Sequence, residues 1–223
     1  MKNLAFTLLV ALLWLAPGAK GAVVVELFTS QGCSSCPPAD ALLGQLARDP
    51  DVIPIAYHVD YWNGLGWSDP FSAREWTLRQ AQYVRAMHLP SAYTPQMVVG
   101  GTRQMVGSAA AVVRSAIADA ARTPTDATIT VSMAKGIAVV ETNTSRAGLE
   151  LLVVATQSAA VTNVTAGENG GRTLTDVAIA RRLARVPNVA AGDQIHRVPI
   201  EGAHVVAMLQ DPATMRIVAA AKK

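Results

Sequence analysis

The two cysteines of the chain, Cys33 and Cys36, are the residues whose type and spacing most directly predict chemistry. An apolar, β-branched run ends shortly before Cys33, and a stretch with helical spacing of leucines begins at Cys36. Cys33 therefore lies at the start of a predicted helix, where unpaired N–H groups and the helix dipole favour a thiolate. Cys36, one turn further, can attack a mixed disulfide at Cys33 and resolve it. The motif predicts a catalytic redox pair with Cys33 as nucleophile, and the hydroxyls of Ser34 and Ser35 can donate to its sulfur.

A purely stabilising disulfide is a weak alternative explanation for this motif. In the loop-entropy model, so short a ring stabilises a fold by only roughly 2 kcal/mol, less than the ~3 kcal/mol for a 15-residue loop. With two cysteines in 223 residues, the chain is also not a disulfide scaffold.

The elements that position the cysteines form a predicted strand–helix–strand unit. Residues 23–28 and 52–59 are apolar runs typical of strands buried on both faces, and residues 36–48 form the helix between them. Strands connected in this way run parallel and end at the same edge of the sheet. Residues that follow the second strand should therefore lie beside the cysteines.

Three residues at this edge, His58, Asp60 and Trp62, are candidate site residues. His58 is a candidate proton shuttle or metal ligand, and Trp62 is a candidate shield for the disulfide. The alternative for His58 and Asp60 is a polar pair that satisfies the loop backbone. For Trp62 the alternative is simple packing within the loop.

The rest of the chain divides into a short α/β portion and a longer β-rich portion. We predict a helix at 72–87, a hairpin at 96–99 and 102–106, a helix at 108–122 capped by Ser108, and a linker at 123–126. Strands are predicted at 128–133, 137–142, 149–156, 161–165, 195–200, 203–210 and 215–219, and the ambiguous segment 174–186 is assigned to a strand. The sequence thus predicts two domains: an α/β domain at 22–122 with the order βαβ-α-ββ-α, and a mostly antiparallel, sandwich-like β domain at 127–223.

Two motifs together resemble the thioredoxin superfamily. One is the strand that leads to Cys33 and Cys36 at the start of a helix, and the other is Thr94-Pro95 before an antiparallel hairpin. The string ELFTSQGCSSCPPAD, followed by HVDYW, resembles more closely a group of secreted bacterial proteins classed as a domain of unknown function. The thioredoxin resemblance covers residues 22–122 and implies a thioredoxin-like fold there, a cis peptide bond at Pro95, and a Thr94 backbone that pairs with an extended substrate.

The resemblance also makes Glu26 a candidate for the buried acid that thioredoxins use to accept a proton from the second cysteine. The alternative for Glu26 is a side chain that reaches the edge of the sheet. Asp40 is assigned to a first-turn charge that complements the helix N-terminus.

The N-terminal residues 1–21 are typical of a secretory signal peptide. Lys2 precedes an apolar run at 4–16, a Pro-Gly breaker and small residues, so we predict cleavage before Ala22. The alternative is an uncleaved anchor or a buried first helix. Cleavage predicts a periplasmic or secreted protein with no membrane attachment, and it leaves 17 basic and 16 acidic residues. This balance predicts no nucleic-acid partner.

These observations predict a thiol–disulfide oxidoreductase of the bacterial cell envelope. Its partner would be a protein or small-molecule disulfide or thiol, and it would need no cofactor. Two alternatives remain: a metallochaperone-like protein that binds Cu(I) or Zn(II) through Cys33, Cys36 and His58, and a binding module with a permanent disulfide. The oligomeric state and the role of the β-rich portion stay open.

Overall fold

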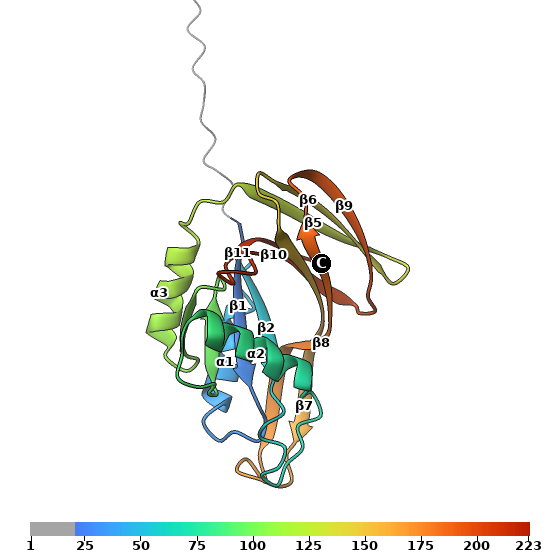
Figure 1. The fold of residues 1–223 in the computed structure, drawn as a ribbon. Helices are drawn as coiled ribbons and strands as arrows, with labels where there is room; N and C mark the ends of the chain where they lie inside the picture. Colours follow the sequence, from blue (N-terminus) through green and yellow to red (C-terminus); the bar gives the residue numbers. More distant parts are fainter. Residues whose placement is uncertain (1–20) are drawn as a thin grey trace, which may run out of the picture.

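A computed structural model describes residues 21–223, so the predicted signal peptide lies outside the described residues apart from Gly21. The elements in chain order are β1 (Val23–Thr29), α1 (Pro37–Leu46), β2 (Val52–His58), α2 (Arg74–Ala86), β3 (Gln96–Val99), β4 (Arg103–Val106), α3 (Ala110–Ala120), β5 (Ala127–Ala134), β6 (Ile137–Thr144), β7 (Leu149–Asn163), β8 (Thr173–Val189), β9 (Gly192–Pro199), β10 (His204–Gln210) and β11 (Ile217–Lys222) (Figure 1). The described part of the chain is 45% strand and 17% helix.

Most of the strands form one mixed sheet with the order β11-β10-β7-β8-β2-β1-β3-β4, and β5, β6 and β9 form a second, three-stranded sheet. As predicted, β1 and β2 are parallel, and their register brings Thr29 opposite His58 at the carboxyl ends. β2 also pairs in parallel with β8, where Ala56 lies opposite Ile179. The predicted common edge therefore exists, and a strand from the second half of the chain borders it.

The predicted fold class, a thioredoxin-like βαβ-α-ββ-α domain followed by a separate β-sandwich, is wrong. β7, β8, β10 and β11 hydrogen-bond into the same eight-stranded sheet as β1 to β4. The physical reason is burial, since residues 151–155 and 205–210 are buried at every position. Strands of a two-layered sandwich alternate between buried and exposed residues, whereas these strands are covered on both faces.

Alternate residues of β1 belong to two cores on opposite faces of the large sheet. Val24 and Phe28 pack with Trp76 and Tyr83 of α2, together with residues of β2, β7 and β10. The apolar residues of β1 at odd-numbered positions pack against α1 and α3 in a second core. Its members are Val23, Val25, Leu27, Ala39, Leu42, Leu43, Leu46, Val52, Ala56, Met97, Val99, Val113 and Ala116. The strand that leads to the cysteines is thus held rigidly from both sides.

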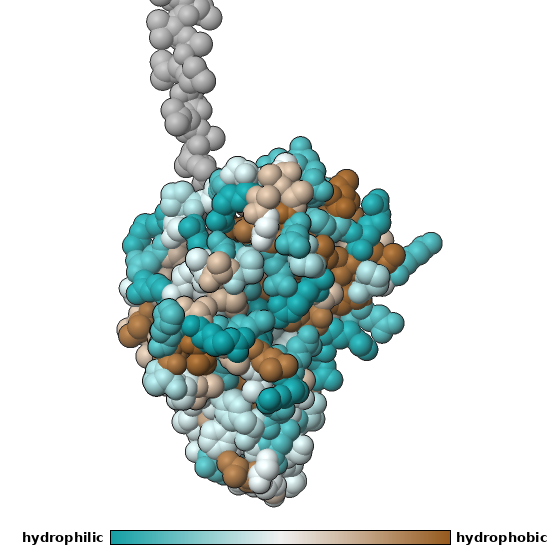
Figure 2. Space-filling model, viewed as in Figure 1, coloured by the Kyte–Doolittle hydropathy of each residue, from teal (hydrophilic) through white to brown (hydrophobic). Residues whose placement is uncertain are grey.

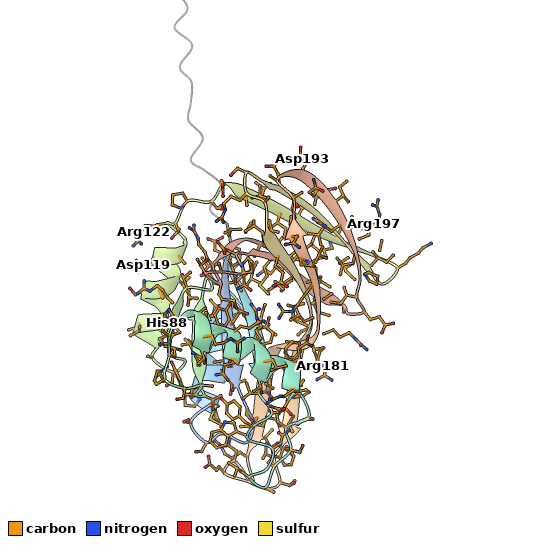
Figure 3. The ribbon with its side chains drawn as sticks, in the orientation of Figure 1. His88, Asp119, Arg122, Arg181, Asp193 and Arg197 are labelled. Carbon is orange, nitrogen blue, oxygen red and sulfur yellow. A yellow bond between two sulfur atoms is a disulfide. The ribbon has the colours of Figure 1, made fainter. Side chains whose placement is uncertain are left out.

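The three-stranded sheet packs against β7 and β10 through a third core. Figure 2 shows hydrophobic surface over this part of the molecule, and Ile137 of β6 and Ile195 of β9 are exposed there. One exposed ion pair joins Asp119 of α3 to Arg122, which follows the helix (Figure 3). Among the described residues, no helix is long and apolar enough to cross a membrane.

Candidate redox site

Cys33 and Cys36 form a disulfide in the loop between β1 and α1, with their Cα atoms 5.4 Å apart. This redox loop, residues 30–36, turns tightly because the Cys33 N–H donates to the Ser30 carbonyl oxygen at 3.1 Å, and the Cys36 N–H donates to the Cys33 carbonyl oxygen at 3.2 Å. Cys36 is the N-cap residue of α1. Both cysteines are 0% exposed.

The two serines between the cysteines are exposed, and each makes a different contact. The Ser35 hydroxyl lies 3.3 Å from the Cys33 sulfur, which is the contact predicted for a small hydroxyl at this position. The Ser34 N–H donates instead to Glu168 Oε2 at 2.9 Å. The redox loop is therefore solvated on its outer side while its sulfur atoms are covered.

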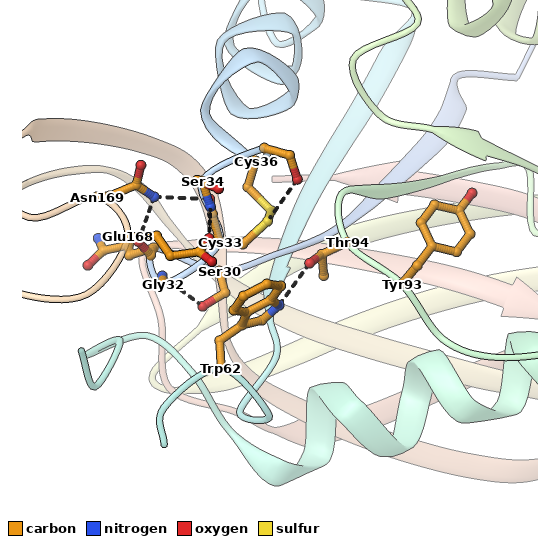
Figure 4. Close-up of a disulfide and its surroundings, with 12 residues drawn as sticks. Ser30, Gly32, Cys33, Ser34, Cys36, Trp62, Tyr93, Thr94, Glu168 and Asn169 are labelled. Atoms are coloured by element: carbon orange, nitrogen blue, oxygen red, sulfur yellow. Dashed lines mark hydrogen bonds between the residues drawn. A yellow bond between two sulfur atoms is a disulfide. The ribbon is translucent and has the colours of Figure 1, made fainter. Parts of the chain in front are cut away.

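Trp62 and Thr94 lie on the side of the disulfide away from Ser34 (Figure 4). The Thr94–Pro95 peptide bond is cis, which confirms the expectation from the resemblance. The indole N–H of Trp62 donates to Thr94 Oγ1 at 2.9 Å and so connects the loop after β2 with the loop before β3. A Cβ atom on Gly32 would lie 3.1 Å from Trp62 Cβ, so glycine permits this close approach. Trp62 thus lies against the redox loop, as predicted.

His58, at the end of β2, is buried in a polar cluster behind the redox loop. Its Nδ1 lies 2.7 Å from Asp69 Oδ2, and its Nε2 lies 4.0 Å from Asp176 Oδ1. Asp69 Oδ2 also accepts the Gln31 N–H at 2.8 Å, and Gln31 Nε2 donates to Asp176 Oδ2 at 2.7 Å. Through Gln31, the cluster is joined directly to the redox loop.

The pKa values in this cluster follow from burial and mutual charge. Burial lowers the pKa of His58, but its hydrogen bond with Asp69 and the charges of Asp69, Asp176 and Asp40 outweigh burial and raise the pKa overall. Burial raises the pKa of Asp69, but the contact with His58, together with hydrogen bonds from the Gln31 and Phe71 N–H groups, outweighs burial and lowers the pKa overall. Burial raises the pKa of Asp176, which faces His58 less closely. Each member of the His58–Asp69 pair therefore favours the charged form of the other.

Asp40 is a site residue that the sequence analysis missed. It follows Cys36 by one helical turn, so the two side chains lie on the same face of α1. Burial raises the pKa of its carboxyl to about 7, against the opposing charge of His58. The spacing Cys-x-x-x-Asp was the signal that could have identified it, because residues four apart in a helix are neighbours.

Two other predicted site residues are engaged elsewhere. Asp60 Oδ1 accepts the hydroxyl of Thr77 at 2.5 Å, and its N–H donates to the same Thr77 oxygen. Glu26 is fully buried beneath α2, where its carboxylate binds the Arg79 guanidinium at 2.6 Å and accepts the Tyr83 hydroxyl. Neither carboxylate has a contact with the polar cluster at His58 in the described part of the chain.

Two further residues that touch the redox loop, Glu168 and Asn169, come from the turn between β7 and β8. Asn169 is 0% exposed, and its amide donates to the carbonyl oxygens of Gln31 and Cys33. No local sequence signal could have placed a turn 136 residues further along the chain against Cys33.

The geometry offers no support for a metal centre. Within residues 21–223, no group of three or more His, Cys, Asp and Glu side chains is arranged to hold a metal ion. The set considered for Cu(I) or Zn(II), Cys33, Cys36 and His58, is divided between a disulfide and an ion pair with Asp69.

Comparisons with known proteins place this chain among proteins of the same architecture. A protein of Agrobacterium tumefaciens with an X-ray crystal structure is 26% identical, with a TM-score of 0.80 over 91% of this chain and 93% of that chain. HBP35 of Porphyromonas gingivalis is 14% identical, with a TM-score of 0.61 over 92% of this chain and 75% of that chain, and this likeness concerns the fold alone. The search of curated proteins found no match. A family model matches residues 24–213, most of the chain, and the chain therefore belongs to the family described as Protein of unknown function (DUF1223).

Proposed function

We propose that this protein is a thiol–disulfide oxidoreductase that uses Cys33 and Cys36, with Asp40 as the group that exchanges a proton with Cys36. The observation that carries the proposal is the carboxyl of Asp40, whose pKa burial raises to about 7, one helical turn from a disulfide at the start of α1. The thioredoxin resemblance of Cys33, Cys36 and cis-Pro95 belongs to this proposal.

The proposed exchange begins with the disulfide and a partner that carries two thiols. A partner thiolate attacks the Cys33 sulfur, the Cys33–Cys36 bond breaks, and Cys36 leaves as a thiolate. Asp40, protonated below its pKa of about 7, donates a proton to that thiolate. The second partner thiolate then attacks the mixed disulfide and releases Cys33. Two electrons pass from the partner to the cysteine pair, and the two protons that the partner thiols release on becoming thiolates are taken up through water by the ionised Asp40 and by the Cys33 thiolate. With an oxidised partner, every step runs in reverse.

The cluster behind the redox loop supports this proton transfer electrostatically. The positive charge of protonated His58 favours the ionised form of Asp40 and opposes the effect of burial on its carboxyl. Asp69 in turn holds His58 through a 2.7 Å contact at Nδ1. The cluster can therefore hold Asp40 in either protonation state, which a group that both gives and accepts a proton requires.

The partner in this proposal is a disulfide or dithiol, and the electrons reside on the two sulfur atoms, so the reaction needs no further cofactor. Export by the predicted signal peptide would place the exchange in the periplasm or outside the cell. Disulfide exchange is a chemistry that such oxidising compartments use.

Reduction of a model protein disulfide by the reduced protein tests the proposal. We expect the wild type to catalyse the reduction, Cys33→Ser to abolish it, and Cys36→Ser to accumulate a mixed disulfide with the substrate. The matched control is Asp51→Asn, which alters an exposed carboxylate in the loop between α1 and β2 and leaves both thiols in place. Equal, slow rates for the wild type and Cys33→Ser would refute the proposal.

One observation favours a second candidate, a binding module with a permanent disulfide. Both cysteines are 0% exposed, and burial of this kind protects a disulfide from thiols. In that case neither cysteine variant would change binding of the partner or trap a mixed disulfide.

A further inference from the structure

The hairpin of β7 and β8 reaches from the second half of the chain to the redox loop. Its tip, residues 164–172, is closed by backbone hydrogen bonds between Val164 and Arg172 and between Gly171 and Val164. Figure 4 shows Glu168 and Asn169 of this tip beside Cys33, opposite Trp62. The tip and the redox loop are thus in direct contact, although more than 130 residues separate them in the chain.

Asn169 makes the most specific contact between the two segments. Its Nδ2 donates to the carbonyl oxygen of Gln31 at 2.9 Å and to that of Cys33 at 3.0 Å. Its Oδ1 accepts from Arg172 Nη1 at 2.7 Å, and this contact fixes which end of the amide faces the redox loop. A fully buried amide with three hydrogen bonds holds the Cys33 backbone in one position.

Three further contacts fasten the tip on the site. Glu168 Oε2 accepts the Ser34 N–H at 2.9 Å, and hydrogen bonding from the Ser34 hydroxyl and then from this N–H lowers the pKa of the Glu168 carboxyl. Gly167, with φ +70°, lies so close to the β2–α2 loop that a Cβ atom would be 3.0 Å from Trp67 Cβ. Trp67 Nε1 in turn donates to Gln31 Oε1 at 3.1 Å. The tip therefore contacts the redox loop directly at the backbone of residues 31, 33 and 34, and it contacts the side chain of Gln31 through Trp67.

We propose that the hairpin tip restrains the redox loop, with Asn169 as the positioning residue, and that thiol exchange at Cys33 requires release of this restraint. A thiolate must approach the Cys33 sulfur along the S–S axis, and both cysteines are 0% exposed. Movement of residues 31–34 that would expose the sulfur breaks the hydrogen bonds to Asn169 and Glu168. The inference deepens the proposed function and rests on it, but it concerns a chemical reactivity that can be measured without a physiological partner.

Reduction of the oxidised protein by dithiothreitol under native conditions tests the inference. Asn169→Asp keeps the shape and the contact with Arg172, but it turns a carboxylate oxygen towards two carbonyl oxygens. We expect reduction to be about tenfold faster, because two hydrogen bonds that hold the loop are lost. Glu168→Gln, which weakens a single contact on the exposed side, should accelerate reduction by a smaller factor.

Asn163→Ala is the matched control, because Asn163 Oδ1 accepts from the Thr173 hydroxyl where β7 and β8 border the tip, and the redox loop is not among its hydrogen-bond partners. The disulfide of this variant should be reduced by dithiothreitol at the wild-type rate. If Asn169→Asp lowers the overall stability, the reduction rates of Glu168→Gln and Asn163→Ala are compared under conditions that give both variants the same free energy of unfolding. Faster reduction of Glu168→Gln under those conditions supports the restraint.

A second readout is the pH profile of Cys33 alkylation in the reduced protein. Glu168→Gln should move this profile to lower pH. The substitution removes a negative charge beside the Ser34 N–H, and a thiolate at Cys33 forms more readily when that charge is absent.

Wild-type reduction rates in both Asn169→Asp and Glu168→Gln, or slower reduction in either, would overturn the inference. This result is distinguishable from failure of the proposed function. A protein whose variants are reduced faster but which never reduces a protein disulfide retains the restraint and lacks the activity.

Discussion

Replacement of Asp40 by asparagine tests the unusual state of the carboxyl beside the disulfide. Asparagine has nearly the same shape and cannot ionise. In the folded protein, burial raises the pKa of Asp40 from 3.8 to about 7, so the folded state holds a proton that the unfolded chain releases at lower pH. Between these two values the folded state binds more protons, and the stability of the wild type therefore falls as the pH rises from 4 to 7.

The size of this effect follows from the shift. Each unit of pKa difference corresponds to about 1.4 kcal/mol, so a shift of about three units contributes at most about 4 kcal/mol of pH-dependent stability. Asp40→Asn removes this contribution, while the groups that face it, His58, Asp69 and Asp176, remain in both proteins. The free energy of unfolding of the variant should therefore rise relative to wild type between pH 4 and pH 8, by at most about 4 kcal/mol.

Urea unfolding of the oxidised proteins at several pH values between 4 and 8 measures this difference directly. Asp51→Asn, an exposed carboxylate in the loop between α1 and β2, is the matched control and should follow the wild-type pH dependence. Parallel pH profiles for the wild type and Asp40→Asn would refute the assignment of a buried, protonated carboxyl at this position.

Two other substitutions test the packing around the site. Glu26→Gln should lower the free energy of unfolding by about 3 kcal/mol in urea titrations, because it leaves the fully buried Arg79 guanidinium without its negative partner; a loss below 1 kcal/mol would contradict the ion pair. Gly101→Ala should destabilise by about 2 kcal/mol or more, since Gly101 has φ +76° and a Cβ atom there would collide with the Met215 carbonyl oxygen. A melting temperature equal to wild type would show that this contact between the β3–β4 turn and the C-terminal strands is absent.

Local sequence signals predicted most of the elements. The apolar runs at 23–28 and 52–59 are β1 and β2, and the ambiguous segment 174–186 is part of the strand β8. The predicted strands 149–156 and 161–165 are one continuous strand, β7, because the residues between them include no glycine or proline that would end it. The predicted Ser108 cap is wrong, since α3 has Ala109 as its N-cap with no side-chain hydrogen bond.

Pairing between distant strands could not be predicted in this way. Turn residues and hydrophobic periods report on neighbours in sequence, whereas β8 lies beside β2 through a contact between Ala56 and Ile179. The same limit applies to the site. The short-range prediction placed His58 and Trp62 near the cysteines, but Asp176 and Asn169 reach them only because β7 and β8 join the large sheet.

The equilibrium reduction potential of the Cys33–Cys36 pair, measured in thiol–disulfide buffers on the native protein, tests the central claim most directly. A redox-active pair should equilibrate with the potentials of known dithiol oxidoreductases, between about −270 and −120 mV. A potential below about −300 mV, the range of structural disulfides, would show that the disulfide is permanent and would contradict the proposed exchange.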